Sequence, residues 1–423
     1  MSTKGFWKAG HPPSLLAAFL YFDVSFMVWV LLGPLAPFLS DTLHLTPGQK
    51  GMMVALPLLG GSLFRPILGM LGEVMGGRKA GLLGLTVTFI PLLLAWRWAH
   101  TLHHFYLVGL LLGVAGASFA VALPLAGSWY PPEYQGLAMG IAGAGNSGTL
   151  IATLLAPRIA QKLGWPTTFA LAMLPVAFVW VLFALMAKDS PNRPKRTSWS
   201  SYAALFKQAD TAWFCFFYSL TFGGFVGLAS FLTVFFHDQY GLAKVRAGDF
   251  TTIVVVAGSF LRPVGGWIAD RVGGYRVLLV LLFGVGCCLA GISSLPALPI
   301  VVSLLFLTMG MLGMGNGAVF QLVPQRFPDR IGIITGLVGA AGGLGGFLLP
   351  SLLGAIKDKT GQYGIGILLF GTVFVIGTIA LLLLGSAWRE SWNEMSAERG
   401  GIFCYRTFAK QWFGRSEAVE DEV

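Results

Sequence analysis

Residues 65–77 read Arg-Pro-Ile-Leu-Gly-Met-Leu-Gly-Glu-Val-Met-Gly-Gly, and residues 262–274 read Arg-Pro-Val-Gly-Gly-Trp-Ile-Ala-Asp-Arg-Val-Gly-Gly. The arginine, the proline, one glycine, the acidic residue and the final double glycine recur in register at an offset of 197 residues. Each arginine lies in an apolar segment, where a full positive charge costs at least about 2.5 to 3.5 kcal/mol. A cost repeated at equivalent positions indicates that Arg65 and Arg262 share a function.

The chain of 423 residues is strongly apolar, with 55% hydrophobic and only 11% charged residues. This composition is typical of a polytopic membrane protein, not of a soluble domain. Twelve apolar runs are long enough to cross a bilayer, which takes about 20 residues; they occupy 14–39, 51–72, 80–96, 104–128, 136–157, 166–187, 212–236, 249–268, 276–295, 299–324, 332–356 and 364–387. The first run is too long for a cleavable signal peptide, so we expect it to stay in the membrane. The sequence therefore predicts an all-α membrane protein with twelve transmembrane helices.

The composition changes between the sixth and seventh runs, where residues 188–211 are charged and contain prolines. We interpret this segment as a linker between two halves of six helices each, residues 1–187 and 212–387, followed by a tail at 388–423. Because each half has an even number of spans, both halves have the same orientation. They are therefore expected to be parallel, pseudo-symmetric repeats related by an axis along the membrane normal.

The net charge of +10 is unevenly distributed along the chain. If both termini are cytoplasmic, 18 of the 28 Lys and Arg residues lie on the cytoplasmic side and eight on the other, while the remaining two are Arg65 and Arg262. The positive-inside rule requires this asymmetry, so the charge indicates a multi-pass protein of the cytoplasmic membrane and not a nucleic-acid-binding protein. No His, Cys or carboxylate cluster has catalytic or metal-ligand spacing. We expect a monomer in the lipid bilayer with no cofactor and no enzymatic activity.

Pseudo-symmetry predicts that Arg65 and Arg262 face each other across a central cavity near the membrane midplane. The acidic residues Glu73 and Asp270 lie eight residues further along, which is about 12 Å along a helix. Two unpaired guanidinium groups suit a planar or tetrahedral oxyanion, which their forked donors bind in a bidentate manner. In the alternative interpretation, each arginine reaches its own acidic residue and locks a cytoplasmic loop.

The twelve spans, the central linker and the repeat resemble the architecture of the major facilitator superfamily. Residues 69–79 are similar to the loop motif that this superfamily carries between spans two and three, and residues 266–276 are similar to its degenerate second copy. Residues 143–148 (Gly-Ala-Gly-Asn-Ser-Gly) and 339–346 (Gly-Ala-Ala-Gly-Gly-Leu-Gly-Gly) resemble the paired nitrate-signature segments of the nitrate/nitrite porter family. Both Arg-Pro pairs are similar to the substrate arginines of that family.

This resemblance implies secondary active transport of nitrate, and also of nitrite, by alternating access. It implies that Arg65 and Arg262 ligate the anion within a site completed by hydrogen bonds from Asn146 and Tyr218, by the rings of Phe119 and Phe222, by Phe26 as a closing residue, and by the signature glycines Gly145 and Gly342. The second signature departs from the first because Gly343 stands where Asn146 does. Polar contact is therefore expected mainly from the N-terminal half.

Charged residues also lie at the cytoplasmic end of each copy of the repeated motif. We expect the cytoplasmic ends of the repeated motif to form a gate that latches helices together, made of Glu73 with Arg78 and of Asp270 with Arg271 and Arg276.

Asp23, in the first span, is a candidate proton carrier, because an anion that enters a cell against 100 mV needs about 2.3 kcal/mol from a coupled process. In the alternative interpretation, Asp23 is an interfacial residue whose carboxylate reaches water or a neighbouring hydroxyl. Nitrate/nitrite exchange, or transport of another small oxyanion, would use the same two arginines.

Overall fold

The computed structural model describes residues 5–191, 207–327, 331–392 and 394–402. Two predicted segments therefore lie partly outside the described residues: the centre of the linker, 192–206, and the end of the tail, 403–423. The described residues contain helices and no strands, and twelve helical segments are long and apolar enough to cross a membrane. The prediction of an all-α protein with twelve spans is confirmed.

The first half contains α1 (Phe6–Ala9), α2 (Pro12–Trp29), α3 (Leu32–Leu43), α4 (Pro47–Met75), α5 (Gly77–Arg97), α6 (Leu102–Gly116), α7 (Phe119–Gly127), α8 (Pro132–Gly143), η1 (Ala144–Ser147), α9 (Gly148–Leu163) and α10 (Trp165–Met186). The second half contains α12 (Ala209–Tyr218), η2 (Ser219–Gly223), α13 (Gly224–Tyr240), α14 (Lys244–Val272), α15 (Gly274–Ser293), α16 (Leu298–Arg326), α17 (Ile331–Thr360), α18 (Gly364–Ser391) and α19 (Glu394–Gly400).

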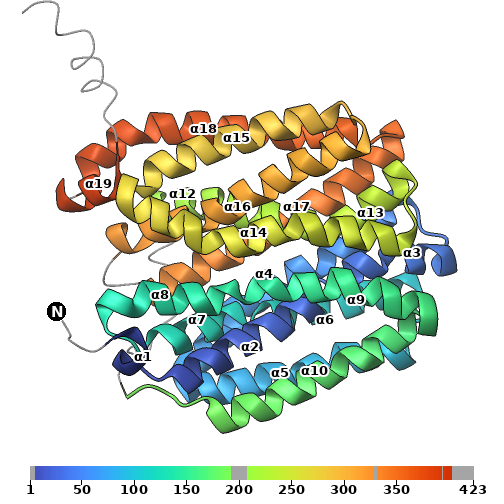
Figure 1. Ribbon diagram of the computed structural model, residues 1–423, viewed down its shortest axis with the longest axis horizontal. Coiled ribbons are helices and arrows are strands. Elements are labelled where there is room, and N and C mark those ends of the chain that lie inside the picture. Colours follow the sequence, from blue (N-terminus) through green and yellow to red (C-terminus); the bar gives the residue numbers. More distant parts are fainter. Residues whose placement is uncertain (1–4, 192–206, 328–330, 393, 403–423) are drawn as a thin grey trace, which may run out of the picture.

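The two halves lie side by side, with the blue-to-green helices in the lower part of Figure 1 and the yellow-to-red helices in the upper part. The most extensive contacts between them are those of α4 with α17, α9 with α14, and α3 with α13. We call the end of the bundle that carries α1, α8 and α19 the linker face, and the opposite end, where α3 leads into α4 and α13 into α14, the far face (Figure 1).

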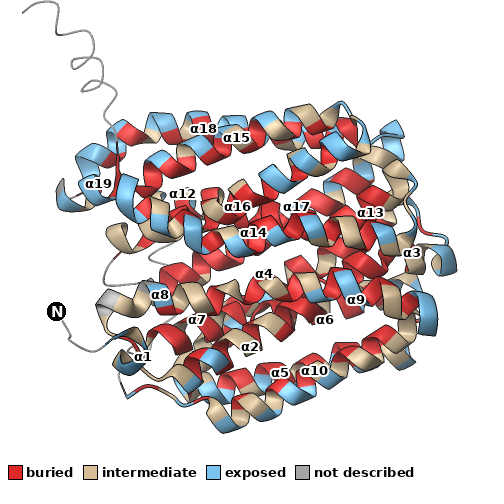
Figure 2. Ribbon diagram, viewed as in Figure 1, coloured by how far each residue is buried: buried red, intermediate tan, exposed pale blue. Residues whose placement is uncertain are grey.

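Large apolar side chains cover much of the outside of the bundle. Phe178 and Leu185 on α10, Val280 on α15 and Leu383 on α18 are all exposed. Buried residues instead concentrate in the central helices α13 and α17 (Figure 2). A helical protein satisfies its backbone hydrogen bonds internally, so such an apolar exterior suits hydrocarbon and not water.

Four spans are interrupted near their middle. Span 1 breaks between α2 and α3, span 4 between α6 and α7, span 5 at the 3₁₀ turn η1, and span 7 at the π-helical turn η2. The counterparts of spans 4 and 5 in the second half, α16 and α17, are unbroken helices. Irregular turns inside helices often mark functional sites, and these breaks direct attention to the centre of the bundle.

Candidate functional site

Arg65 projects from α4 into the interior and is only 1% exposed. Its Nε donates a hydrogen bond to the main-chain oxygen of Gly116 (3.1 Å), and its Nη1 donates to that of Gly339 in the other half. Its Cζ lies 5.1 Å from the ring centroids of Trp29, Phe119 and Phe222, which is within cation–π range. The remaining nitrogen, Nη2, is buried and has no hydrogen-bond partner within the described ranges of the chain. Arg65 is thus firmly held and keeps one free donor.

Arg262 occupies the equivalent position on α14 and is 7% exposed. Its Nη2 donates to the Tyr218 hydroxyl at 3.5 Å, a long and therefore weak bond. The ring centroids of Phe119 and Phe320 lie 5.8 and 5.9 Å from its Cζ. Its Nη1 is buried and has no hydrogen-bond partner among the residues described. Among the described residues, neither Arg262 nor Arg65 forms an ion pair with a carboxylate. The predicted loop lock between each arginine and its own acidic residue is therefore absent from this part of the chain.

Aromatic rings enclose both guanidinium groups. Phe119 is shared, since its ring lies against Arg65 and Arg262. Tyr218 and Phe222 stack in parallel at 5.1 Å, one helical turn apart. Phe26 contacts the ring of Phe222 edge-on at 6.3 Å. The structure therefore brings these rings from spans 1, 4 and 7 to one place.

Two aromatic residues of this wall, Trp29 and Phe320, were not singled out from the sequence. Trp29 lies three residues after Phe26, a spacing that places both on one helix face and could have indicated it. Phe320 has no aromatic counterpart at Leu123, 197 residues earlier, so the repeat carries no signal for it.

The two signature segments cross between the halves. A Cβ added at Gly143 would lie 3.6 Å from Cζ of Arg262, whereas one added at Gly339 would lie 3.7 Å from Nη1 of Arg65. Each arginine therefore lies against the signature of the other half. Asn146, in the turn η1, is fully buried, and neither its amide nitrogen nor its amide oxygen has a hydrogen-bond partner in the described part of the chain.

Gly145 and Gly342 allow close helix packing. A Cβ at Gly145 would lie 2.8 Å from the main-chain nitrogen of Asp23, and one at Gly342 would lie 2.7 Å from the ring of Tyr218 and 2.9 Å from that of Phe222. Only glycine permits such an approach. These two residues fit span 5 against span 1 and span 11 against span 7, and Gly342 thereby sets the position of two of the rings.

Asp23 lies beside the first signature, and its carboxylate accepts a hydrogen bond from the Ser147 hydroxyl (2.6 Å). It lines an apolar crevice between α2, α9 and α10, together with Met27, Ile151 and Thr168. It is not among the residues that line the pocket at Arg65.

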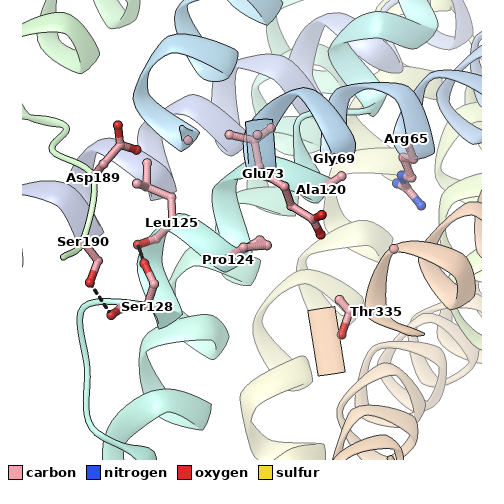
Figure 3. A pocket seen from close by; sticks show the side chains of 14 residues that line it. Arg65, Gly69, Glu73, Ala120, Pro124, Leu125, Ser128, Asp189, Ser190 and Thr335 are labelled. Carbon is pink, nitrogen blue, oxygen red and sulfur yellow. Dashed lines mark hydrogen bonds between the residues drawn. The ribbon is translucent and has the colours of Figure 1, made fainter. Parts of the chain in front are cut away.

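A pocket leads from Arg65 towards the linker face. Gly69, Glu73, Ser128, Asp189 and Thr335 are among its lining residues. In Figure 3 the Glu73 carboxylate points into this pocket, between Pro124 and Thr335. The pocket therefore connects the arginine site with the side of the bundle that carries the linker.

The far face is closed by contacts that all join the two halves. Ion pairs link Lys50 with Asp238, Lys244 with Asp41, and Arg158 with Asp249 (2.6 Å). The Asp358 carboxylate accepts hydrogen bonds from the Gly48 main chain (2.8 Å) and the Thr46 hydroxyl (3.1 Å). In the described residues, the site is thus shielded on this face and reached from the other.

The predicted gate residues lie on the linker face. The main-chain N–H of Arg78 donates to Asp189 (3.0 Å), and its guanidinium donates to the Ala184 carbonyl (2.6 Å), so it ties α5 to the end of α10. Arg271 lies 3.9 Å above the ring of Trp267. Asp270 and Arg276 are exposed.

Comparison with known proteins gives the same architecture. The family described as Major Facilitator Superfamily matches residues 17–350. A solved structure titled "Crystal structure of D-xylose-proton symporter" superposes with a TM-score of 0.72 at 15% identity, covering 87% of this chain and 96% of that one. At that identity the likeness concerns the fold alone.

Curated relatives are similar over most of their length. The "Nitrite extrusion protein" of Bacillus subtilis is 33% identical over 86% of this chain and 92% of its own. The "Probable nitrate/nitrite transporter NarK2" of Mycobacterium tuberculosis is 34% identical over 85% and 93%. The "Probable nitrate transporter NarT" of Staphylococcus haemolyticus is 30% identical over 88% and 95%.

Proposed function

This chain belongs to the nitrate/nitrite porter family of the major facilitator superfamily, and we propose that it carries nitrate, and also nitrite, across the cytoplasmic membrane. It is a transporter and not an enzyme. One observation carries the substrate assignment. Arg65 and Arg262 come from equivalent positions of the two halves and share the ring of Phe119. Among the described residues, each keeps an unpartnered N–H and forms no ion pair with a carboxylate.

The chemistry of the site fits a small planar oxyanion. Unpartnered buried donors are costly unless a ligand satisfies them. No described residue satisfies Arg65 Nη2, Arg262 Nη1 or the Asn146 amide. A guanidinium binds a planar oxyanion in its own plane with two bonds. The surrounding rings of Trp29 and Phe222 exclude water, which strengthens these bonds. A bulky or strongly hydrated solute would not suit such a site.

We propose that the halves, residues 1–187 and 212–387, rock about this site to give alternating access, with the linker at 188–211 and the linker face in the cytoplasm. The ion pairs of the far face and the pocket at the linker face support an inward-facing arrangement. When the linker face closes, we expect the predicted gate residues Glu73 and Asp270 to latch the helices of this face together.

We propose proton-coupled uptake, with Asp23 as the protonated group. Its carboxylate is bound to Ser147, the neighbour of Asn146, so a change in its charge would act directly on the turn η1. Exchange of nitrate for nitrite is the second candidate, favoured by one observation. Asp23 lines the crevice between α2, α9 and α10 and not the pocket of Arg65.

The substrate assignment is tested by nitrate uptake into proteoliposomes. We expect nitrite to compete with nitrate, and phosphate and carboxylates not to compete. The Arg262→Lys variant keeps the charge but loses the forked donor pair, so its uptake should fall about a hundredfold or more. Thr308→Val, which alters a buried hydroxyl bonded within α16, is the matched control and should transport normally. Unchanged uptake by Arg262→Lys would refute the assignment.

Proton symport and nitrate/nitrite exchange are distinguished by applying a proton gradient and a nitrite gradient to the same vesicles. Proton symport predicts uptake driven by an inward proton gradient without internal nitrite, and loss of that response in Asp23→Asn. Exchange predicts uptake that requires internal nitrite and is indifferent to the proton gradient. If Asp23→Asn retains both accumulation and nitrate-driven proton movement, Asp23 is not the proton carrier.

A further inference from the structure

Asn316 lies in the middle of α16 and is fully buried, yet neither its amide nitrogen nor its amide oxygen has a hydrogen-bond partner among the residues that the structure describes. Burying an unsatisfied amide costs on the order of 1 to 3 kcal/mol. Most buried polar side chains in folded proteins have partners. An isolated amide inside the bundle therefore requires an explanation.

The neighbours of Asn316 along the helix show where its side chain points. A Cβ at Gly315 would lie 2.8 Å from the Thr221 side chain in η2, and one at Gly317 would lie 2.5 Å from the main-chain oxygen of Arg262 in α14. Successive residues of a helix are separated by about 100°. Asn316 therefore points between spans 7 and 8, towards the interior.

Phe320 gives the same direction independently. It lies one turn after Asn316 on the same face of α16. Its ring centroid is 5.9 Å from Cζ of Arg262 and 5.0 Å from the Tyr218 ring. The face of α16 that carries Asn316 is thus the face that lines the arginine site.

The repeat adds a third observation. Asn316 stands 197 residues after Phe119, the ring shared by both arginines. The second half has Gly343 where the first has Asn146. The signature of the second half, in span 11, has no amide side chain. Asn316 provides one from span 10 instead.

We propose that Asn316 is a second amide ligand of the anion and that it favours a planar anion with three oxygens over a bent anion with two. This inference rests on the proposed function. The two arginines and Asn146 supply donors for two oxygens, and Asn316 serves the third. An anion without a third oxygen leaves this amide unpaired, and a site built to hydrogen-bond a group discriminates against ligands that lack it.

The test measures the affinities of purified Asn316→Ala for nitrate and for nitrite by titration calorimetry. Loss of one hydrogen bond to a charged ligand should weaken nitrate binding about tenfold or more. Nitrite binding should change less than about threefold, because that anion does not use the amide. The same two affinities are measured for Asn316→Leu, which keeps the volume and removes both polar atoms. Its loss of affinity for nitrate should again exceed its loss for nitrite. Thr308→Val, on the same helix, should leave both affinities unchanged.

Equal losses for the two anions, or no loss in either variant, would overturn the role of Asn316. The wild-type protein separates this outcome from a failure of the proposed function. If wild type binds neither anion, the proposed function fails; if wild type binds both and the variants match it, only the inference about Asn316 fails.

Discussion

Arg65 and Arg262 occupy equivalent positions in the repeat but are held very differently. Arg65 donates to two main-chain carbonyls and lies against three rings. Arg262 has one long bond to Tyr218 and lies against two rings at greater distance. Equal sequence motifs thus produce one fixed arginine and one with freedom to adjust to a ligand.

The cause of this difference is the break in span 4. The N–H of Ala120 bonds to Ala117 (3.0 Å) instead of to Gly116 four residues before it, so the Gly116 carbonyl loses its usual helical partner and accepts from Arg65. Its counterpart, Gly313, lies within the unbroken helix α16, where the carbonyl is used by the helix itself. Arg262 therefore finds no carbonyl at the equivalent place.

The largest expected effect compares Arg65→Lys with Arg262→Lys. Both should reduce nitrate uptake by about a hundredfold or more, because each removes a forked donor. Only Arg65→Lys should also lower stability, by about 2 kcal/mol, since it leaves the buried carbonyl of Gly116 unpaired. Thermal unfolding of the purified variants measures this difference. Equal stability of the two variants would show that the arginines are equally restrained.

A smaller effect is expected from the glycines that pack spans 5 and 11. A Cβ at Gly148 or Gly345 would overlap the backbone of Asp23 or Ser219. Gly148→Ala and Gly345→Ala should each destabilise the protein by about 1 to 3 kcal/mol.

The repeat supplies matched controls for this experiment. An added Cβ at Gly140 or Gly336 would have no described atom within 4 Å, so Gly140→Ala and Gly336→Ala should unfold at the wild-type temperature or above it. If all four variants behave alike, close packing is not the role of these glycines.

The smallest effect compares Asn146 with Gly343. Asn146→Ala should weaken nitrate binding about tenfold while leaving thermal stability unchanged or higher, because it removes an unsatisfied buried amide. Gly343→Ala should lower thermal stability and leave nitrate binding unchanged. Its Cβ would press on Ser62 and lie 3.1 Å from the Leu58 carbonyl, at the contact of α4 with α17. Calorimetric titration and thermal unfolding give both quantities. A loss of stability in Asn146→Ala would assign that residue a structural role instead.

Much of the fold follows from the sequence because apolar length and repetition are local signals. The twelve spans are read from runs of about 20 apolar residues, and the arginines stand out because a charge in such a run is costly. The breaks in spans 1, 4, 5 and 7 carry no equally simple signal. Span 1 was predicted as 14–39 without interruption, whereas the structure ends α2 at Trp29 and begins α3 at Leu32.

Contacts within the site depend on tertiary packing and could be predicted only in part. The repeat and the resemblance point to Arg65, Arg262 and Asn146 individually. The bond of Arg65 to Gly339 cannot be read from either segment, because it arises only when α4 packs against α17. The position of Asp23 in an apolar crevice has the same origin, since it depends on how α2, α9 and α10 surround it.

The ion pairs of the far face differ in exposure, so dissolved salt acts on them unequally. The side chains of Lys50 and Asp238 are 9% and 12% exposed, whereas that of Asp41, paired with Lys244, is 66% exposed. Screening shortens the range of exposed charges from about 8 Å at physiological ionic strength to about 3 Å at 1 M. In the proposed orientation this face meets the external medium. We therefore expect high external salt to weaken the exposed Lys244–Asp41 pair more than the buried Lys50–Asp238 pair. The ratio of inward- to outward-facing states should then depend on the external salt concentration. The ratio of inward- to outward-facing states, measured by spin-label distances across the exposed positions 42 and 246 at increasing salt, tests this.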